Sequence, residues 1–167
     1  MNKNQTVEQE EQQLVVFDLA QEAYGVDINV VREIIRMQDI TSVPKTLEFV
    51  KGVINLRGRV IPVVDLRKRF ALPEAEHTKD SRIVVVDISG HDIGMVVDAV
   101  TEVMRIPNSS VAPPSAIITS TDSDYLQGIA KLESKLIILL DLDRIFTEDE
   151  KQVLEEEATS AESLAAA

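Results

Sequence analysis

Two histidines are the first candidates for chemistry in this sequence. An imidazole can bind a metal ion or transfer a proton near neutral pH. His77 and His91 each lie in a polar stretch typical of a linker or a turn, and neither has a second histidine at ligand spacing. We therefore interpret both as solvated loop residues and expect no metal site and no cofactor. The sequence also lacks the nucleophile elbow, the P-loop and the dinucleotide-binding glycine pattern.

Close pairs of acids are the second candidates, because hydrolases work with paired carboxylates. The pairs are Asp122 with Asp124 and Asp141 with Asp143. Asp141 has a counterpart in Asp65 within an internal repeat described below, which favours a shared structural role as the cap of a short turn. We expect a protein without catalytic activity. A small-ligand-binding protein or a carboxylate-dependent enzyme stays open as the alternative.

The composition predicts a core of aliphatic side chains. Of the 167 residues, 44% are hydrophobic but only 4% aromatic, so Val, Ile and Leu must fill the core, and these residues favour strands. There is no cysteine, which permits a reducing compartment. The first 13 residues are polar and acidic, unlike a signal peptide, and no apolar run is long enough for a membrane span. We expect a cytoplasmic protein without direct membrane insertion.

The net charge of -12 lies mostly at the ends of the chain. Residues 1–13 and 147–167 together hold ten acids and two bases, which leaves a body of only mildly acidic charge. Within the body, five bases cluster into a local patch that favours an acidic protein partner: Arg57, Arg59, Arg67, Lys68 and Arg69. Nucleic-acid binding needs a broader basic face with stacking aromatic residues, so we expect no nucleic-acid partner.

An internal repeat organises the sequence. An offset of 76 places residues 50–70 over residues 126–146 without a gap, and Gly52 then meets Gly128. An offset of 69 places residues 14–20 over 83–89 and residues 24–36 over 93–105. Because both copies carry the same order of strand patterns, the sequence predicts two similar β-units in one chain.

The elements expected within the first copy are mostly strands. Residues 14–19 and 25–28 favour strands, and residues 29–36 favour a helical turn that leads into a strand, although a helix fits them as well. Residues 50–70 predict a hairpin that turns at residues 56–59, followed by one helical turn. We expect residues 71–80 to form a linker between two subdomains, residues 14–80 and 81–146. The N-terminal strand or the C-terminal segment can cross over from one subdomain to the other.

The two ends of the chain are expected to differ. Residues 1–13 are expected to form a disordered acidic tail. Thr147 and Glu150 have the spacing of a capping box, so a C-terminal helix should begin there. After Glu157 the sequence lacks an apolar face, and we expect that stretch to be frayed.

The hairpin tip is where the two copies differ. The first copy has Asn55, Leu56, Arg57 and Gly58, where the second has Lys131, Leu132, Glu133 and Ser134. Arg57 is therefore not needed to make this hairpin. It is either a solvated turn residue or a functional one, whose planar guanidinium, held by a rigid scaffold, binds carbonyl or carboxylate groups of a partner.

The run VKGVINLRGRVIPVVDLR, with YGVDINVVREI before it and GMVVDAVTEV after it, closely resembles the CheW family of chemotaxis coupling proteins. The resemblance covers residues 14–146. It implies an all-β fold of two five-stranded SH3-like barrels, with short helices and a C-terminal helix. It also implies a non-enzymatic cytoplasmic adaptor that links methyl-accepting chemoreceptors to the histidine kinase CheA in membrane receptor arrays.

The resemblance also implies site residues. In the family, a groove between the subdomains accepts the receptor tip, which places Arg57 at the receptor contact, with Asn55 and Gly58 shaping its turn. Val31 and Glu33 match positions associated with receptor or kinase contact. Kinase contacts in the family come from apolar patches at the ends of each barrel. Gly52 matches a position expected to affect the kinase contact, but its counterpart Gly128 makes a structural role an equal alternative.

Overall fold

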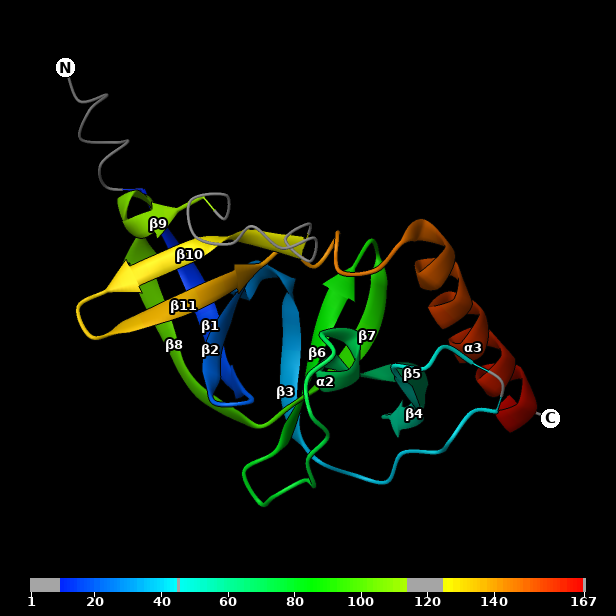
Figure 1. The fold of residues 1–167 in the computed structure, drawn as a ribbon. Coiled ribbons are helices and arrows are strands. Elements are labelled where there is room, and N and C mark those ends of the chain that lie inside the picture. Colours follow the sequence, from blue (N-terminus) through cyan, green and yellow to red (C-terminus); the bar gives the residue numbers. More distant parts are fainter. Residues whose placement is uncertain (1–9, 45, 114–124, 167) are drawn as a thin grey trace.

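The computed structural model describes residues 10–44, 46–113 and 125–166, which form two β-sheets (Figure 1). Sheet A has the strand order β8-β1-β2-β11-β10-β9, and sheet B has the order β3-β6-β7-β5-β4. The strands are β1 (Glu11–Leu19), β2 (Glu22–Asp27), β3 (Val31–Arg36), β4 (Val50–Leu56), β5 (Arg59–Asp65), β6 (Arg82–Ile88), β7 (His91–Val97), β8 (Ala99–Pro107), β9 (Val111–Ala112), β10 (Leu126–Leu132) and β11 (Lys135–Leu140). The helices are η1 (Ile28–Val30), α2 (Leu66–Arg69), η2 (Asn108–Ser110) and α3 (Glu148–Ala166). The predicted all-β fold is confirmed.

The two copies of the repeat exchange strands between the sheets. Sheet A takes β1 and β2 from the first copy and β8, β10 and β11 from the second, and sheet B takes the converse set. With each strand matched to its repeat counterpart, both sheets have the same strand order apart from β9. In both, the copies meet in one antiparallel pair, β1 with β8 and β3 with β6, and in one parallel pair, β2 with β11 and β7 with β5. A boundary at residue 80 therefore does not separate the sheets. The sequence left open that a terminal strand or segment crosses over. In the structure β1 and β2 of the first half and β6 and β7 of the second half both pair with strands of the other half.

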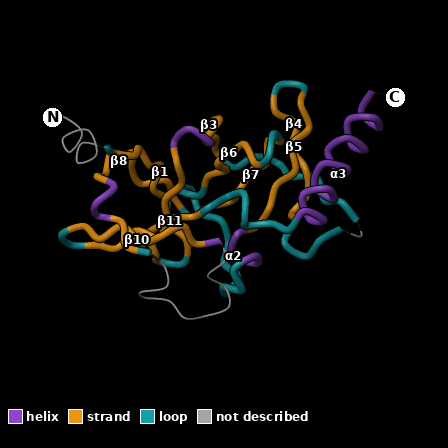
Figure 2. Tube along the Cα trace, turned by 90° about the horizontal axis from the view of Figure 1, so that it is seen from above, coloured by secondary structure: helices purple, strands orange, loops and turns teal. Residues whose placement is uncertain are grey.

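Sheet A has one strand more than the five that we expected. Its sixth strand, β9, is only two residues long and pairs with β10. At the equivalent place sheet B has a single bridge between Thr41 and Val53, with N–O distances of 2.9 and 2.8 Å. Both sheets are consistent with SH3-like barrels, although in neither does the hydrogen-bonded ladder close on itself among the described residues. Figure 2 shows β8, β10 and β11 at one end of the molecule and α3 at the other.

A shared core joins the two sheets. Along β1, Leu14 and Val16 pack into the core of sheet A, whereas Val15, Phe17 and Leu19 pack into the shared core. The counterpart strand β6 also sends alternate residues into the core of sheet B and into the shared core. Because side chains alternate across a strand, a strand buried on both faces must be apolar throughout. This explains the unbroken aliphatic runs at the start of each copy.

Local turns and caps agree with the sequence predictions. η1 leads directly into β3, as preferred for residues 29–36. The Oδ1 atom of Asp65 accepts the N–H groups of Arg67 and Lys68 and so caps α2. Its counterpart Asp141 accepts the N–H of Asp143 at 3.1 Å. These bonds support the structural interpretation of both aspartates. Asp122 and Asp124 lie outside the described residues.

The ends of the chain differ from expectation. β1 begins at Glu11, so part of the stretch expected to be a disordered tail pairs with β8. α3 begins after Thr147, whose N–H and side chain exchange bonds with Glu150 as a capping box, but its backbone continues to Ala166 and is not frayed after Glu157. The alanines of this stretch have the highest helix propensity of any residue, which accounts for the extension. None of the described helices has the length and apolar character of a membrane span.

Candidate partner-binding site

The β4–β5 hairpin fixes its tip through an unusual backbone. Arg57 and Gly58 both have positive φ, +53° and +87°, as in the tight turns that match the twist of paired strands. The Oδ1 atom of Asn55 accepts the N–H of Gly58 at 2.8 Å and braces the turn. A Cβ atom at Gly58 would meet nothing within 4 Å, so the backbone angle, not space, requires glycine there. The side chain of Arg57 is 70% exposed.

Arg57 binds Glu33, which lies on β3. The Nη1 atom donates to Oε1 at 3.2 Å, and Nη2 donates to Oε2. The hydrogen bond lowers the pKa of Glu33 and raises that of Arg57. Because β3 and β4 are the two edges of sheet B, the pair connects its edges. Two residues that the sequence singled out separately therefore meet at one exposed site.

The structure does not bring Val31 or Gly52 to this tip. Val31 is half-buried and packs against the shared core. Gly52 is buried, with φ of +151°, and a Cβ atom there would lie 2.0 Å from the backbone oxygen of Thr41. A Cβ at Gly128 would lie 2.8 Å from the oxygen of Ala112. Both glycines thus let another backbone segment approach, which favours the structural alternative for Gly52.

The bases of the predicted basic patch are paired within the molecule, while Arg57 and Arg59 stay 70% and 67% exposed, so an acidic partner remains a prediction. Each of the five bases has a partner within the molecule. Two of these partners lie across sheet B, one lies in the linker that follows α2, and one lies at the junction between the sheets. The partners are Glu33 for Arg57, Asp92 for Arg59, Asp98 for Arg67, Glu74 for Lys68, and the backbone oxygen of Ile145 with the Glu150 carboxylate for Arg69. Arg69 also lies over three aromatic rings.

A pocket lies between the two sheets, away from the hairpin tip. Asp27 and Leu140 line it from sheet A, Asp87 from sheet B, and Asp141 and Asp143 from the turn after β11. Arg57 does not line this pocket, although the family resemblance placed it at a groove between the subdomains. Among the described residues no group of acids and histidines could hold a metal ion.

A chain of ion pairs connects the pocket to the hairpin, and sequence reasoning missed it. Arg32 binds Asp87 at 3.1 Å and Asp92 at 3.3 Å, and Arg59 binds the other oxygen of Asp92 at 2.7 Å. These partners are between 33 and 60 residues apart in sequence. No local pattern marks them, and the pairing of β3 with β6, of β6 with β7 and of β7 with β5 brings them together.

Large apolar side chains are exposed on both sheets. The large hydrophobic residues that are exposed among the described ones are Ile34 at 38%, Val103 at 50% and Leu136 at 53%. Ile34 and Val103 are repeat counterparts, on β3 and β8. The residues that precede Val103 and Leu136 in sequence, Glu102 and Lys135, form an ion pair at 2.6 Å.

The fold and these surfaces define a class: a binding protein with two matched β-subdomains and its distinctive residues on exposed turns and edges. The chain belongs to the CheW family, because the family model described as "CheW-like domain" matches residues 13–150. The resemblance inferred from the sequence is thereby confirmed. The chain is a non-enzymatic chemotaxis adaptor, and the alternative of an enzyme is not supported.

Relatives with this family name come from distant bacteria. The chemotaxis protein CheW of Treponema pallidum is 32% identical over 89% of each chain. That of Thermotoga maritima is 35% identical over 81% of this chain and 88% of its own. The crystal structure of the scaffolding protein TtCheW from Thermoanaerobacter tengcongensis is 44% identical, with a TM-score of 0.79 over 87% of this chain and 99% of that one.

Proposed function

We propose that this chain couples methyl-accepting chemoreceptors to the histidine kinase CheA in membrane-associated arrays, from the cytoplasm. The observation that carries the proposal is the exposed Arg57–Glu33 pair on a hairpin tip that the second copy builds without an arginine. The turn itself forms without an arginine in the second copy, and an exposed guanidinium held on a rigid turn is suited to contact a partner. An adaptor without chemistry must act through such surfaces.

The receptor contact is assigned to the tip. The Arg57 guanidinium is planar and presents several donors in a fixed fork, which matches carboxylate and carbonyl groups of a helical hairpin. Glu33 holds the fork in place, and Asn55 and Gly58 hold the backbone beneath it. An exposed ion pair contributes little to stability, so it can be remade with a partner at small cost.

The kinase contact is assigned to the exposed apolar side chains of the two sheets. Val103 and Leu136 are exposed on sheet A, and Ile34 is the counterpart of Val103 on sheet B. Apolar anchors within a polar rim are typical of protein interfaces. Gly52 acts on this contact only through the backbone that it lets approach, and not by touching the kinase itself.

A crossed titration tests both assignments. Arg57→Ala should weaken binding to a receptor-tip fragment about tenfold, as expected for a lost hydrogen bond to a charged group, and leave binding to a CheA regulatory domain unchanged. Leu136→Ser should do the reverse. Arg59→Ala is the matched control, because Arg59 is equally exposed on the same hairpin. Equal receptor affinity of Arg57→Ala and the unaltered protein would remove the tip from the site.

A further inference from the structure

The chain passes between the two sheets at two equivalent places. One crossing runs from β2 through η1 to β3, and the other from β7 through Asp98 to β8. They are equivalent because β7 and β8 are the repeat counterparts of β2 and β3. Figure 1 shows the first crossing at the upper side of the molecule and the second at the lower side. Their side chains differ in a way that the shared fold does not require.

The crossing at Asp98 is tied by directional bonds. Arg67 of α2 donates from Nε to Oδ1 at 3.2 Å and from Nη2 to Oδ2 at 2.6 Å. The N–H of Ala20, in the β1–β2 turn of sheet A, donates to Oδ2 at 2.9 Å, and the N–H of Asp98 donates to the oxygen of Asp18 at 3.0 Å. Arg67 also donates to the oxygen of Pro73 in the linker at 2.7 Å. One carboxylate thus joins both sheets.

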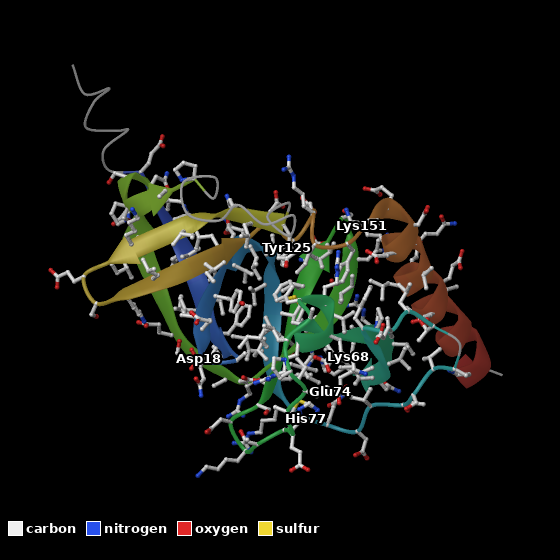
Figure 3. The ribbon with its side chains drawn as sticks, viewed as in Figure 1. Asp18, Lys68, Glu74, His77, Tyr125 and Lys151 are labelled. Atoms are coloured by element: carbon white, nitrogen blue, oxygen red, sulfur yellow. The ribbon has the colours of Figure 1, made fainter. Side chains whose placement is uncertain are left out.

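The charges at this crossing reinforce the bonds. Burial alone would raise the pKa of Asp98, but the hydrogen bonds from Arg67 and Ala20 outweigh it and leave the pKa lowered. Figure 3 shows Asp18 at the end of β1, on the same side of the molecule as Glu74 and His77 of the linker and opposite Tyr125. The tie is therefore confined to one side of the interface between the sheets.

The other crossing lacks this tie. Asn29 stands where the second crossing has Asp98, and Asp143 stands where it has Arg67. The pocket lined by Asp27, Asp87 and Asp143 lies at this crossing, and the hydrogen bonds and ion pairs of these three aspartates stay within one sheet or one turn. A bond from Arg69 to Ile145 belongs to neither crossing, since these two residues are each other's counterparts and lie near the axis of the repeat.

We infer that Arg67 and Asp98 are positioning residues that hold the two sheets together at the crossing through Asp98. This crossing is the pivot about which one sheet rotates against the other, so that the spacing of the sheets changes at the crossing through η1. The shared core resists separation of the sheets, but apolar contacts are non-directional and only weakly oppose a rotation of one sheet against the other. A bidentate pair of Arg with a carboxylate adds a fixed geometry. The pocket between the sheets is therefore the side that widens and narrows.

Spin-label distances test the pivot directly, because the chain has no cysteine and labels attach only where they are introduced. One double variant, Gln21→Cys with Lys68→Cys, spans the tied crossing. A second, Arg32→Cys with Arg144→Cys, spans the pocket side, because Arg32 binds Asp87 and Arg144 follows Asp143, and both aspartates line the pocket. We expect a narrow distance distribution across the tie and a broader one across the pocket. Equal widths in the unaltered background would overturn the inference.

Substitution of the tie provides the second arm. Asp98→Asn should broaden the distribution across the tied crossing, Arg67→Met should do the same, and both together should add nothing further. The control is Lys51→Met, which breaks an ion pair of similar burial inside sheet B. If Asp98→Asn does not fold, Arg67→Lys keeps the charge and loses only the fork, and should still broaden the distribution. An unchanged width in the folded tie variants would refute the pivot.

A consequence for binding rests on the proposed function. If the receptor needs one spacing of the sheets, Asp98→Asn should weaken its binding while a circular dichroism spectrum of the folded protein stays unchanged. The label distances do not involve a receptor, so the pivot and the receptor assignment fail separately.

Discussion

Glu33 and Glu102 occupy the same position in the two copies of the repeat, and each binds a cation of the nearby hairpin. In sheet A that cation is Lys135, the counterpart of Arg59, whereas in sheet B it is Arg57 at the tip. An ion pair from β3 or its counterpart β8 to the hairpin is therefore common to both copies, and only the position of the cation on the hairpin differs. Arg57 thus serves the fold locally while it displays a guanidinium at the most exposed point of the turn.

This pair predicts a pH-dependent signal. The pKa of Glu33 is lower in the folded protein than in an unfolded chain, mainly through the Arg57 hydrogen bond. The pair's contribution is thus complete above the unfolded pKa, about 4.3, and is lost as pH falls through the lower folded value. In NMR titration of the Glu33 carboxyl carbon, Arg57→Ala should move the midpoint upward, and Arg59→Ala should not. An unmoved midpoint in Arg57→Ala would show that the pair does not form in solution.

Residue roles could be predicted from the sequence when the interaction was local. The cap at Asp65 and the capping box at Thr147 and Glu150 involve groups two or three residues apart, so the spacing itself contains the geometry. The intramolecular partners of the basic patch were missed for the opposite reason. Arg57 and Arg59 find their carboxylates 24 and 33 residues away, and closeness in sequence said nothing about those partners.

At the scale of elements, two buried glycines mark where an extra segment crosses a bulged strand. In both β4 and β10 the register shifts just before the glycine, at Gly52 and Gly128. The segment that crosses is held by the bridge at Thr41 in one case and by β9 in the other. A repeat of glycines at equal spacing was thus a signal of close backbone approach.

Gly52→Ala should destabilise the protein by at least about 2 kcal/mol, because the new Cβ would need a disfavoured φ and would collide with backbone. Gly58→Ala is the control, since Gly58 also has a positive φ, but a Cβ atom there would have open space around it. Urea unfolding of both variants measures the difference. A Gly52→Ala protein as stable as the control would mean that Thr41 does not lie over this strand.

At the scale of the whole molecule, the division of the chain was predicted only in part. The repeat identified two similar units with matching strand order. It could not say which strands share a sheet, because a strand's pattern of buried residues is the same whichever neighbour it pairs with. β1 and β2 lie in sheet A and β6 and β7 in sheet B, where Phe17 and its neighbours can pack into the shared core. This core exists only in the assembled fold.

The exchange predicts that neither half folds alone. A fragment of residues 1–80 would hold two strands of sheet A and three of sheet B, each set without its neighbours. Separate fragments 1–80 and 81–167 should give the poorly dispersed NMR spectra of unfolded chains, and an equimolar mixture should recover native resonances. A dispersed spectrum from either fragment by itself would mean that its strands pair in another arrangement.

The exchange also sets an order on synthesis. Every strand of sheet B lies between residues 31 and 97, so that sheet can be completed while the chain is still being made. The β1–β2 hairpin leaves the ribosome before its partners β8 and β11, which end at residues 107 and 140. Leu14 and Val16 pack with Ile137 and Leu139 of β11, so their face of the hairpin stays without these partners until most of the chain has emerged, and such transiently exposed apolar surface is prone to aggregation.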